Sequence, residues 1–404
     1  MKMLQGCRRI FRNRIRLDSF ALVLSMLLIA LLAPGAQTSE TTDADDVGPI
    51  KVGVYLDLTG QTSSFGQSTL NGINLAVSEI NAEGGVNNRQ VELVIEDDVG
   101  EPGKVSIVVK KLIEEDKVQA LLGDVASTNS LTAAPQAQKA GVPMITPSST
   151  HPSVTRVGDY IFRTCFIDPL QGEAMAKFAF ETLKARRAAI MFYSYSDYSS
   201  GLTETFEQKF TGLGGRVVRK RGYEPSARDF GSQLVSIRAA RPDEIFLPGY
   251  YQQVGAIAKQ ARRLNLKQPL LGGDGWDAPQ LWDIGGKAMN NSYMSNHYAI
   301  DAPSPIVRKF VASYTGRYNY SPDAIAALGY DAMLLLADAI RRAGTTDGQQ
   351  LREAIAQTTN FQGVTGPITI NAGRNATKPV FIVKLLNGKY TYTEAIWPDG
   401  PEQH

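Results

Sequence analysis

Short apolar runs alternate with longer amphipathic runs over the first part of the chain. The predicted strands lie at 50–56, 91–98, 118–124 and 142–148, and the predicted helices lie near 67–83, 102–116 and 128–140. Strands and helices that alternate in this order form a parallel sheet with helices on both faces. The pattern therefore predicts a doubly wound α/β unit.

The same alternation begins again near residue 169 and predicts a second doubly wound unit. Its helices are expected near 169–185, 200–213, 228–240 and 250–264, and its strands at 188–194, 215–223, 243–249 and 268–274. The last part is different, with helices near 304–317, 322–343 and 349–358 before β-rich segments at 366–371 and 379–397. In the last of these segments, the pair Asn387-Gly388 stands between two apolar runs and predicts a β-hairpin.

The first 36 residues differ from the rest in composition. Six basic residues precede an uncharged apolar stretch at 20–33, which is shorter than the roughly 20 residues that a membrane-spanning helix needs. We interpret 1–36 as a secretory signal peptide and 37–49 as a polar linker. An uncleaved N-terminal anchor is the alternative, because cleavage after Ala36 would place Pro34 at the −3 position.

Length and charge limit the function further. A chain of 404 residues suits two packed units better than one core. Without residues 1–36, the chain has 36 basic and 39 acidic residues, a net charge of −3. The basic excess thus belongs to the targeting segment, and we expect no nucleic-acid partner.

Only Cys165 follows that segment, so no intramolecular disulfide is expected, and a buried structural thiol is favoured over a reactive one.

Most catalytic and cofactor motifs are missing. The loop at 58–68 joins a strand to a helix, but it lacks the lysine of a phosphate-binding loop, and no GxGxxG or G-x-S-x-G pattern is present. Three histidines are too few for a histidine-based metal cluster. Asp97-Asp98 ends a strand, and solvated carboxylates are favoured there over a cation site. We therefore expect no enzyme activity, no cofactor and no metal.

Hydroxyl, aromatic and acidic residues follow several of the predicted strands. They are Ser127, the segment 146–150, Tyr198, Tyr250 and Asp274. In open α/β sheets, ligands bind at the carboxyl ends of the strands. Each residue also has an ordinary structural interpretation: Ser127 as a helix N-cap, 146–150 as a turn, Asp274 as a turn aspartate between glycines. Together, however, these residues form one candidate ligand site to which both predicted α/β units contribute.

The segments VGVYLDLTGQTSSFGQSTLNGINLAV, ALLGDVASTNSLTAAPQAQKAGVPMITPSSTHP, YSYSDYSSGL, IFLPGYYQQVGAIAKQAR and LLGGDGWD occur in this order. Over residues 50–396 the chain resembles the type I periplasmic binding proteins, the branched-chain amino acid receptor family of ABC importers. The resemblance implies two Rossmann-like, doubly wound lobes joined by a three-crossover hinge. It places 50–166 plus 298–376 in the first lobe and 167–297 plus 377–396 in the second.

The resemblance also implies a set of groups for an α-amino acid. Ser127 and its helix N-terminus would meet the ligand carboxylate. Thr150 would give its backbone N–H to the carboxylate and its hydroxyl to the ammonium. Ser148 would offer its carbonyl to the ammonium, and Asp274 would stand against the same ammonium.

The walls of the implied pocket are aromatic. Phe65 would contribute from the first lobe, and Tyr198 and Tyr250 from the second, and together with Trp276 they would make an aromatic pocket. Two departures from the family pattern stand out. Phe65 lies where a tyrosine or tryptophan is frequent, and Ala126 lies where some members have a disulfide cysteine.

The expected function is that of a periplasmic receptor, acting as a monomer, which binds an amino acid with a branched-chain or other small side chain. It would deliver this ligand to the membrane permease of an ABC importer. A sensor of amide or urea-type ligands on the same fold is one alternative. An α/β enzyme that uses Asp274 with Tyr198 or Tyr250 is a weaker one, because no nucleophile and base stand out beside them.

Overall fold

Strands and helices alternate through the chain, as the pattern predicts. The computed structural model describes residues 48–302 and 304–397. The predicted signal peptide or anchor at 1–36, and residues 37–47 of the predicted linker, lie outside these residues.

The first sheet has five parallel strands in the order β2-β1-β3-β4-β5. The strands are β1 (Ile50–Leu56), β2 (Val91–Asp97), β3 (Ala120–Leu122), β4 (Met144–Thr146) and β5 (Ile161–Arg163). The helices between them are α1 (Ser63–Ala82), α2 (Pro102–Glu114), α3 (Ser127–Ala140) and α4 (Ser153–Arg156). Three later helices contribute to the same hydrophobic core: α10 (Pro305–Tyr318), α11 (Ala324–Ala343) and α12 (Gly348–Ala356). We call this part the first lobe.

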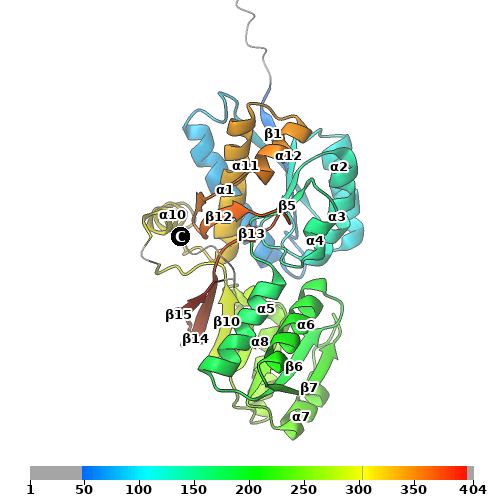
Figure 1. Cartoon of the computed structure of the whole chain (residues 1–404), viewed down its shortest axis with the longest axis vertical. Coiled ribbons are helices and arrows are strands. Elements are labelled where there is room, and N and C mark those ends of the chain that lie inside the picture. Colours follow the sequence, from blue (N-terminus) through cyan, green and yellow to red (C-terminus); the bar gives the residue numbers. More distant parts are fainter. Residues whose placement is uncertain (1–47, 303, 398–404) are drawn as a thin grey trace, which may run out of the picture. The chain divides into compact units, whose positions relative to one another are not determined.

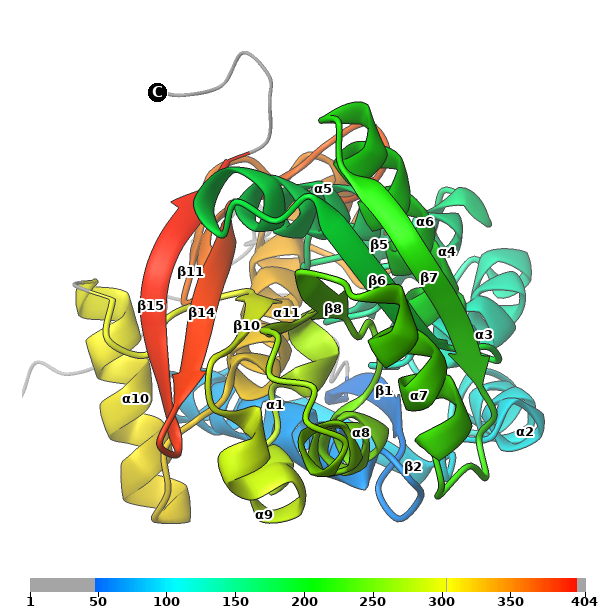
Figure 2. The ribbon, with the colours of Figure 1, turned by 90° about the horizontal axis from the view of Figure 1, so that it is seen from below.

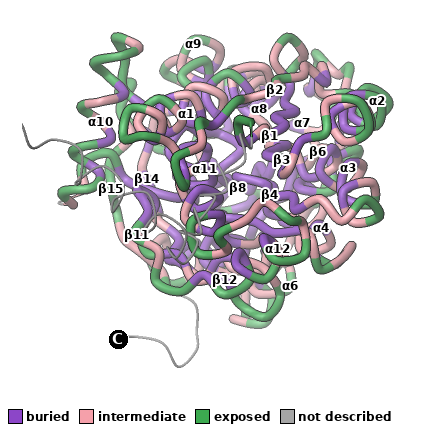
Figure 3. Tube along the Cα trace, turned by 90° about the horizontal axis from the view of Figure 1, so that it is seen from above, coloured by how far each residue is buried: buried purple, intermediate pink, exposed green. Residues whose placement is uncertain are grey.

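Both faces of the first sheet are covered by helices. Val52 and Val54 of β1 pack with α1 and α11, whereas Tyr55 and Leu121 pack on the other side with α2 and α3. Neighbouring residues of a strand point to opposite faces, so short, wholly apolar strands fit between two helical layers. Figure 1 shows α1 and α11 side by side although they are far apart in the sequence. Figure 3 shows β3 and β4 buried, with exposed residues along α2 and α10.

Helix α11 is the central helix of this core, and its ends follow from the sequence. The side chain of Asp323 caps its N-terminus by accepting a hydrogen bond from Ala326 N at 2.8 Å. It ends at Gly344, whose φ of 68° is the left-handed conformation in which glycine commonly terminates helices. Its first turn therefore starts at a defined point, which matters below because Ile325 of that turn lines a cavity.

The second sheet has seven strands in the order β15-β14-β10-β9-β8-β6-β7. Its strands are β6 (Arg187–Tyr193), β7 (Arg216–Tyr223), β8 (Glu244–Phe246), β9 (Leu270–Gly272), β10 (Ser292–Asn296), β14 (Val380–Leu386) and β15 (Lys389–Ile396). Its helices are α5 (Asp168–Lys177), α6 (Asp197–Gly212), α7 (Gly231–Ala240), α8 (Tyr251–Arg263) and α9 (Gln280–Gly285), with the short turns η1 (Phe178–Thr182), η2 (Asp274–Trp276) and η3 (Gly286–Met289). We call this part the second lobe.

Side chains along β6 show the two layers of this lobe. Ala188 and Ile190 pack toward α5 and α6, and Ala189 and Met191 pack toward α7 and α8. Figure 2 shows α5 and α8 on opposite sides of the strands. The doubly wound order predicted for both parts of the chain is confirmed.

Two elements differ from the prediction. Strand β10 was not anticipated, because Ser292, Ser295 and Asn296 give it no apolar run, yet it is buried between β9 and β14. The helix expected near 169–185 is an α-helix only to Lys177, and η1 continues it as a π-helical turn.

The C-terminal hairpin is confirmed. β14 and β15 pair antiparallel, with Leu386 opposite Lys389. Asn387 and Gly388 have φ angles of 52° and 77°, as a two-residue turn with positive φ at both positions requires. A small third sheet of β11 (Phe361–Gly363), β12 (Gly366–Ile370) and β13 (Ala376–Thr377) precedes it.

The chain passes between the two large sheets three times. It leaves β5 for α5, returns from β10 to α10, and leaves β13 for β14. The loops that follow β1, β3 and β4 in the first lobe and β6, β8 and β9 in the second all extend from the carboxyl ends of parallel strands. These loops carry the residues that the sequence marked as candidates for a site.

Candidate functional site

A small buried cavity lies where loops of the two lobes meet. Its volume is about 20 Å³, and it is lined by Phe65, Val125, Ser148, Tyr198, Tyr250, Asp274, Gly275 and Ile325. Five of the seven predicted site residues are among them. They come from the first turn of α1, the loop after β4, the first turn of α6, the residue before α8 and the start of η2. The structure thus brings these strand-end residues together.

The other two predicted residues, Ser127 and Thr150, are buried beside this cavity but do not line it. The N-cap interpretation of Ser127 is wrong: Ala126 is the N-cap residue of α3, and Ser127 is the first residue of the helix. The Ser127 hydroxyl instead accepts a hydrogen bond from His151 N at 3.2 Å, which ties the start of α3 to the loop after β4. The carbonyl of Thr150 accepts from Asp168 N at 3.0 Å.

Several buried polar atoms around the cavity have no hydrogen-bond partner within the described part of the chain. They are Ser148 Oγ, Thr150 Oγ1 and Asp274 Oδ1. Buried polar groups in folded proteins are nearly always paired, and an unpaired one costs about 1–3 kcal/mol. These atoms are therefore available for a bound molecule, in a pocket whose lining contains no lysine or arginine.

Asp274 is held by a histidine that sequence reasoning set aside. Nε2 of His297 lies 2.8 Å from Asp274 Oδ2, and its ring stacks on Phe166 at 3.8 Å with an angle of 20° between the planes. Burial lowers the pKa of His297, so the ring is neutral at pH 7 and donates its Nε2–H to the carboxylate. His297 follows β10, and because that strand was not recognised, nothing in the sequence marked the histidine as a strand-end residue.

The aromatic walls come from both lobes. Phe65 meets Tyr250 edge to face with ring centroids 6.1 Å apart, and Tyr198 stacks on Tyr250 at 5.4 Å. The Tyr198 hydroxyl accepts from Gly275 N at 3.1 Å. Burial raises the pKa of both tyrosines, so both rings are neutral walls.

Trp276 is expected to form part of the same aromatic pocket, and this expectation is wrong. Its side chain is fully buried in the second lobe, where Nε1 donates to Leu247 O at 3.0 Å. It packs close to Gly272, where any Cβ would overlap the indole ring. The indole is therefore a core residue and not part of the cavity lining.

A buried arginine fixes the loop after β4. Arg163 of β5 donates from Nη1 to Ser149 O and from Nη2 to His151 O, the latter at 2.8 Å. These two bonds bracket Thr150 and hold its backbone in place. The residue was missed because a single arginine in a short apolar strand gives no sign of where its side chain ends.

The strand-end carboxylates of β2 also differ from the prediction. Asp98 is fully buried rather than solvated, and burial raises its pKa to about 7. Asp97 is only partly buried and accepts hydrogen bonds from Leu58 N and Thr59 Oγ1. The described residues contain no group of three or more His, Cys, Asp or Glu side chains that would hold a metal ion.

Residues 49–389 match the model of a protein family described as periplasmic binding protein. The chain belongs to the periplasmic binding protein family. This match covers both lobes and all seven predicted site residues.

Solved structures of periplasmic binding proteins are similar over the same range. The leucine binding protein LivK from Thermotoga maritima is 40% identical, with a TM-score of 0.84 over 87% of this chain and 99% of that one. The branched-chain amino acid transporter substrate binding protein LivJ from Streptococcus pneumoniae, solved with isoleucine, is 30% identical, with a TM-score of 0.83 over 87% and 100%. A solute binding protein of an ABC transporter from R. palustris, solved with benzoate, is 25% identical, with a TM-score of 0.80 over 87% and 98%.

Membership in this family decides between binding and catalysis. Periplasmic binding proteins bind substrates rather than convert them, so this chain is a binding protein and the enzyme interpretation is not supported. Its place is outside the cytoplasm. Among the helices of the described residues, none combines the length and the apolar character needed to cross a bilayer.

Proposed function

We propose that this periplasmic binding protein is the receptor for an amino acid with a branched-chain or other small side chain. One observation carries the proposal. One cavity combines aromatic walls, a carboxylate and the unpaired hydroxyl of Ser148, and the unpaired hydroxyl of Thr150 and the N-terminal turn of α3 lie beside it. A zwitterion needs acceptors for its ammonium and donors for its carboxylate, and bonds of this charge-assisted kind are strong when water is excluded.

The proposed placement of the ligand follows from these groups. The ammonium would lie against Asp274, the carbonyl of Ser148 and the hydroxyl of Thr150. The carboxylate would face the backbone N–H of Thr150 and the first turn of α3 with Ser127, where the helix dipole favours an anion. The side chain would then point toward Phe65, Tyr198 and Tyr250.

Ligand entry requires movement. A cavity of about 20 Å³ is too small for an amino acid, so the lobes must separate to admit one. We propose that 50–166 plus 298–376 and 167–297 plus 377–396 move as the two lobes, hinged at the three crossings. Closure around a ligand is a known behaviour of periplasmic binding proteins.

The proposed role is delivery to the permease of an ABC importer, with the receptor working as a monomer in the periplasm after export by the segment 1–36. The names of LivK and LivJ support a branched-chain ligand. The benzoate complex of the R. palustris protein shows that a similar chain binds an aromatic carboxylate without an ammonium. Asp274 argues against such a ligand here, because its carboxylate would repel an anion that brings no cation.

A ligand screen tests the proposal directly. Purified protein is heated with leucine, isoleucine, valine, benzoate or acetamide, and a bound ligand raises the unfolding temperature according to its excess over Kd. We expect stabilisation by at least one of the amino acids and little by benzoate or acetamide. Stabilisation by benzoate alone would overturn the amino-acid proposal, and stabilisation by acetamide alone would favour the amide sensor.

A further inference from the structure

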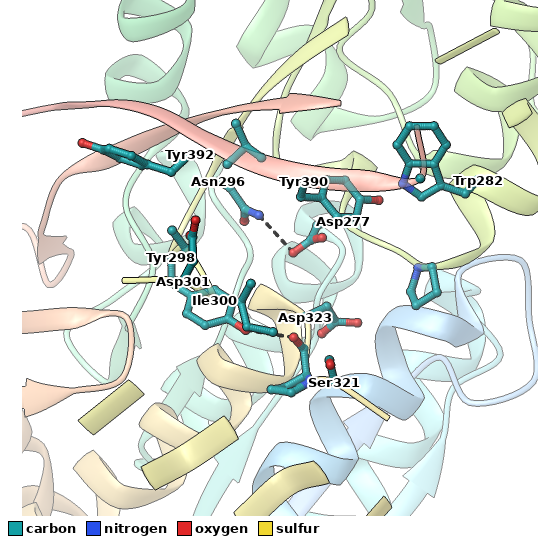
Figure 4. Close-up of a pocket in the computed structure, with 15 residues that line it drawn as sticks. Asp277, Trp282, Asn296, Tyr298, Ile300, Asp301, Ser321, Asp323, Tyr390 and Tyr392 are labelled. Atoms are coloured by element: carbon teal, nitrogen blue, oxygen red, sulfur yellow. Dashed lines mark hydrogen bonds between the residues drawn. The ribbon is translucent and has the colours of Figure 1, made fainter. Parts of the chain in front are cut away.

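A larger cavity lies apart from the proposed amino-acid site. Its volume is about 370 Å³, within the usual range of about 300–1,000 Å³ for small-molecule sites. It shares no lining residue with the small cavity. Its walls come from the turn after η2, the segment after β10, the start of α11 and the hairpin of β14 and β15 (Figure 4).

The walls combine aromatic rings with carboxylates. Trp282, Tyr298, Tyr390 and Tyr392 supply the rings, and the acidic lining residues are Asp277, Asp301 and Asp323. The lining contains no lysine, arginine or histidine. Aromatic faces and carboxylates both attract cations, and the rings also pack against apolar groups.

Two of the carboxylates are each held by only one oxygen. Asp277, which is 5% exposed, accepts through Oδ2 from Ala324 N at 2.8 Å and from Asn296 Nδ2 at 3.1 Å. Asp323 accepts through Oδ1 from Ser68 Oγ and Ala326 N. Their other oxygens have no hydrogen-bond partner within the described part of the chain. Figure 4 shows both carboxylates in the space bounded by Tyr298, Tyr390 and Trp282.

The structure points to one class of ligand. We propose that this cavity binds a small organic cation, a primary ammonium carried on an apolar body. The ammonium would donate to the free oxygens of Asp277 and Asp323, and the apolar body would pack on the rings. An anion would be repelled. A metal ion is disfavoured because the described residues hold no suitable group of three or more ligands.

The raised pKa of Asp323 predicts that the affinity for the cation depends on pH. Burial and the neighbouring Asp277 raise the pKa of Asp323 to about 7. The other titratable groups that face it are Tyr298, Tyr314 and Tyr390, and Asp301 also lines the cavity. A bound cation favours the charged carboxylate, so its affinity should increase as the pH rises from 6 to 8, where a primary amine stays protonated.

The test uses 2-phenylethylammonium as the probe, titrated calorimetrically into the full mature chain. The neutral 2-phenylethanol and the anionic 3-phenylpropionate serve as matched compounds. We expect the cation to bind with one-to-one stoichiometry, more tightly at pH 8 than at pH 6, and the other two compounds to bind at least tenfold more weakly. No binding of the cation at millimolar concentration would overturn the proposal, as would equal binding of the alcohol.

Substitutions of lining residues test whether the cation binds in this cavity. Asp323→Asn keeps a cap for α11 but removes the charge, and Tyr392→Ala changes a ring that is 46% exposed. Both should weaken binding of the cation, by tenfold or more for Asp323→Asn, and Asp323→Asn should also lose the pH dependence. The matched controls Asp338→Asn, on a partly exposed position, and Ile107→Ala, on an exposed one, lie outside the cavity and should bind normally. If Asp274→Asn abolishes binding while Asp323→Asn and Tyr392→Ala retain it, the cation occupies the amino-acid site and the proposal is wrong.

Discussion

The two carboxylate oxygens of Asp274 have different surroundings. One oxygen, Oδ2, is bonded to the neutral ring of His297, and the other, Oδ1, has no partner in the described chain and belongs to a residue that lines the cavity. The histidine is itself fixed by stacking on Phe166. A neutral donor orients the carboxylate without cancelling its charge, which leaves that charge available for the ammonium of a ligand.

Replacing this carboxylate tests the proposed role. Asp274→Asn keeps an oxygen for the His297 donor but removes the charge. We expect the affinity for the best amino acid to fall by about 2–4 kcal/mol, the range for losing a buried charge partner. Isothermal titration calorimetry measures the loss. The exposed Asp283→Asn serves as a matched control, and an unchanged affinity of Asp274→Asn would contradict the proposed placement of the ammonium.

Asp168 offers a test in stability rather than binding. It is fully buried, and burial raises its pKa to about 7, above the ordinary value near 4. Between these two values the folded chain binds a proton that the unfolded chain has lost. The contribution of Asp168 to the free energy of unfolding is therefore fully present below about pH 4 and is lost as the pH rises toward 7.

The variant Asp168→Asn does not titrate, so its free energy of unfolding relative to the natural chain should rise between pH 5 and pH 7. The expected gain is up to about 1.4 kcal/mol per pH unit, with no further change above pH 7. Urea unfolding at pH 5, 6, 7 and 8 measures it, with Asp283→Asn as the exposed control. A difference that does not depend on pH would show that Asp168 is charged throughout this range.

The loop after β4 and the first turn of α3 act as one unit. The Ser127 hydroxyl accepts from His151 N, and Arg163 holds the carbonyls on both sides of Thr150. The backbone groups proposed to meet the ligand therefore depend on a side chain from the neighbouring strand β5. Precise placement of such groups is needed because a small displacement weakens several hydrogen bonds at once.

Arg163→Met removes both donors while keeping much of the apolar stem. We expect a loss of about 2–4 kcal/mol in the free energy of unfolding, because a buried hydrogen-bond network is broken. Affinity for the amino acid should also fall, since the loop is no longer held. Urea unfolding and calorimetry measure the two effects, and Arg156→Met on the exposed end of α4 is the control. Normal affinity in a folded Arg163→Met protein would show that the loop is positioned by other contacts.

Contacts across the cleft join the two lobes in this structure. Thr128 Oγ1 donates to Asp197 Oδ2 at 2.9 Å, and the Tyr251 hydroxyl donates to Gln61 O at 3.4 Å. Phe65 meets the Tyr250 ring over the cavity. The hydrogen bond between Thr128 and Asp197 is exposed to solvent, so a ligand shared by both lobes would add to the free energy of closure.

Saturating amino acid should therefore lower the radius of gyration measured by X-ray scattering. Thr128→Val, which loses both hydrogen bonds between the Thr128 hydroxyl and Asp197, should need a higher ligand concentration for the same change. Trp276 is buried within one lobe, so its fluorescence is not a suitable probe of closure. Identical scattering with and without a ligand shown to bind would mean that the lobes are fixed.

The alternation of apolar and amphipathic runs determined the doubly wound units, the strand ends and the hairpin at Asn387-Gly388, because these depend on period and turn chemistry along the chain. It also indicated the segment 146–150, Tyr198, Tyr250 and Asp274, since the carboxyl ends of parallel strands share one edge. Phe65 and the individual role of Ser148 followed only from the resemblance to the family. Only the tertiary structure decided the partners of these residues. His297 follows a strand with no apolar run, Arg163 reaches a loop from another strand, and Trp276 packs against Gly272 in the core. Each of these outcomes depends on segments distant in sequence that only the folded sheets bring together.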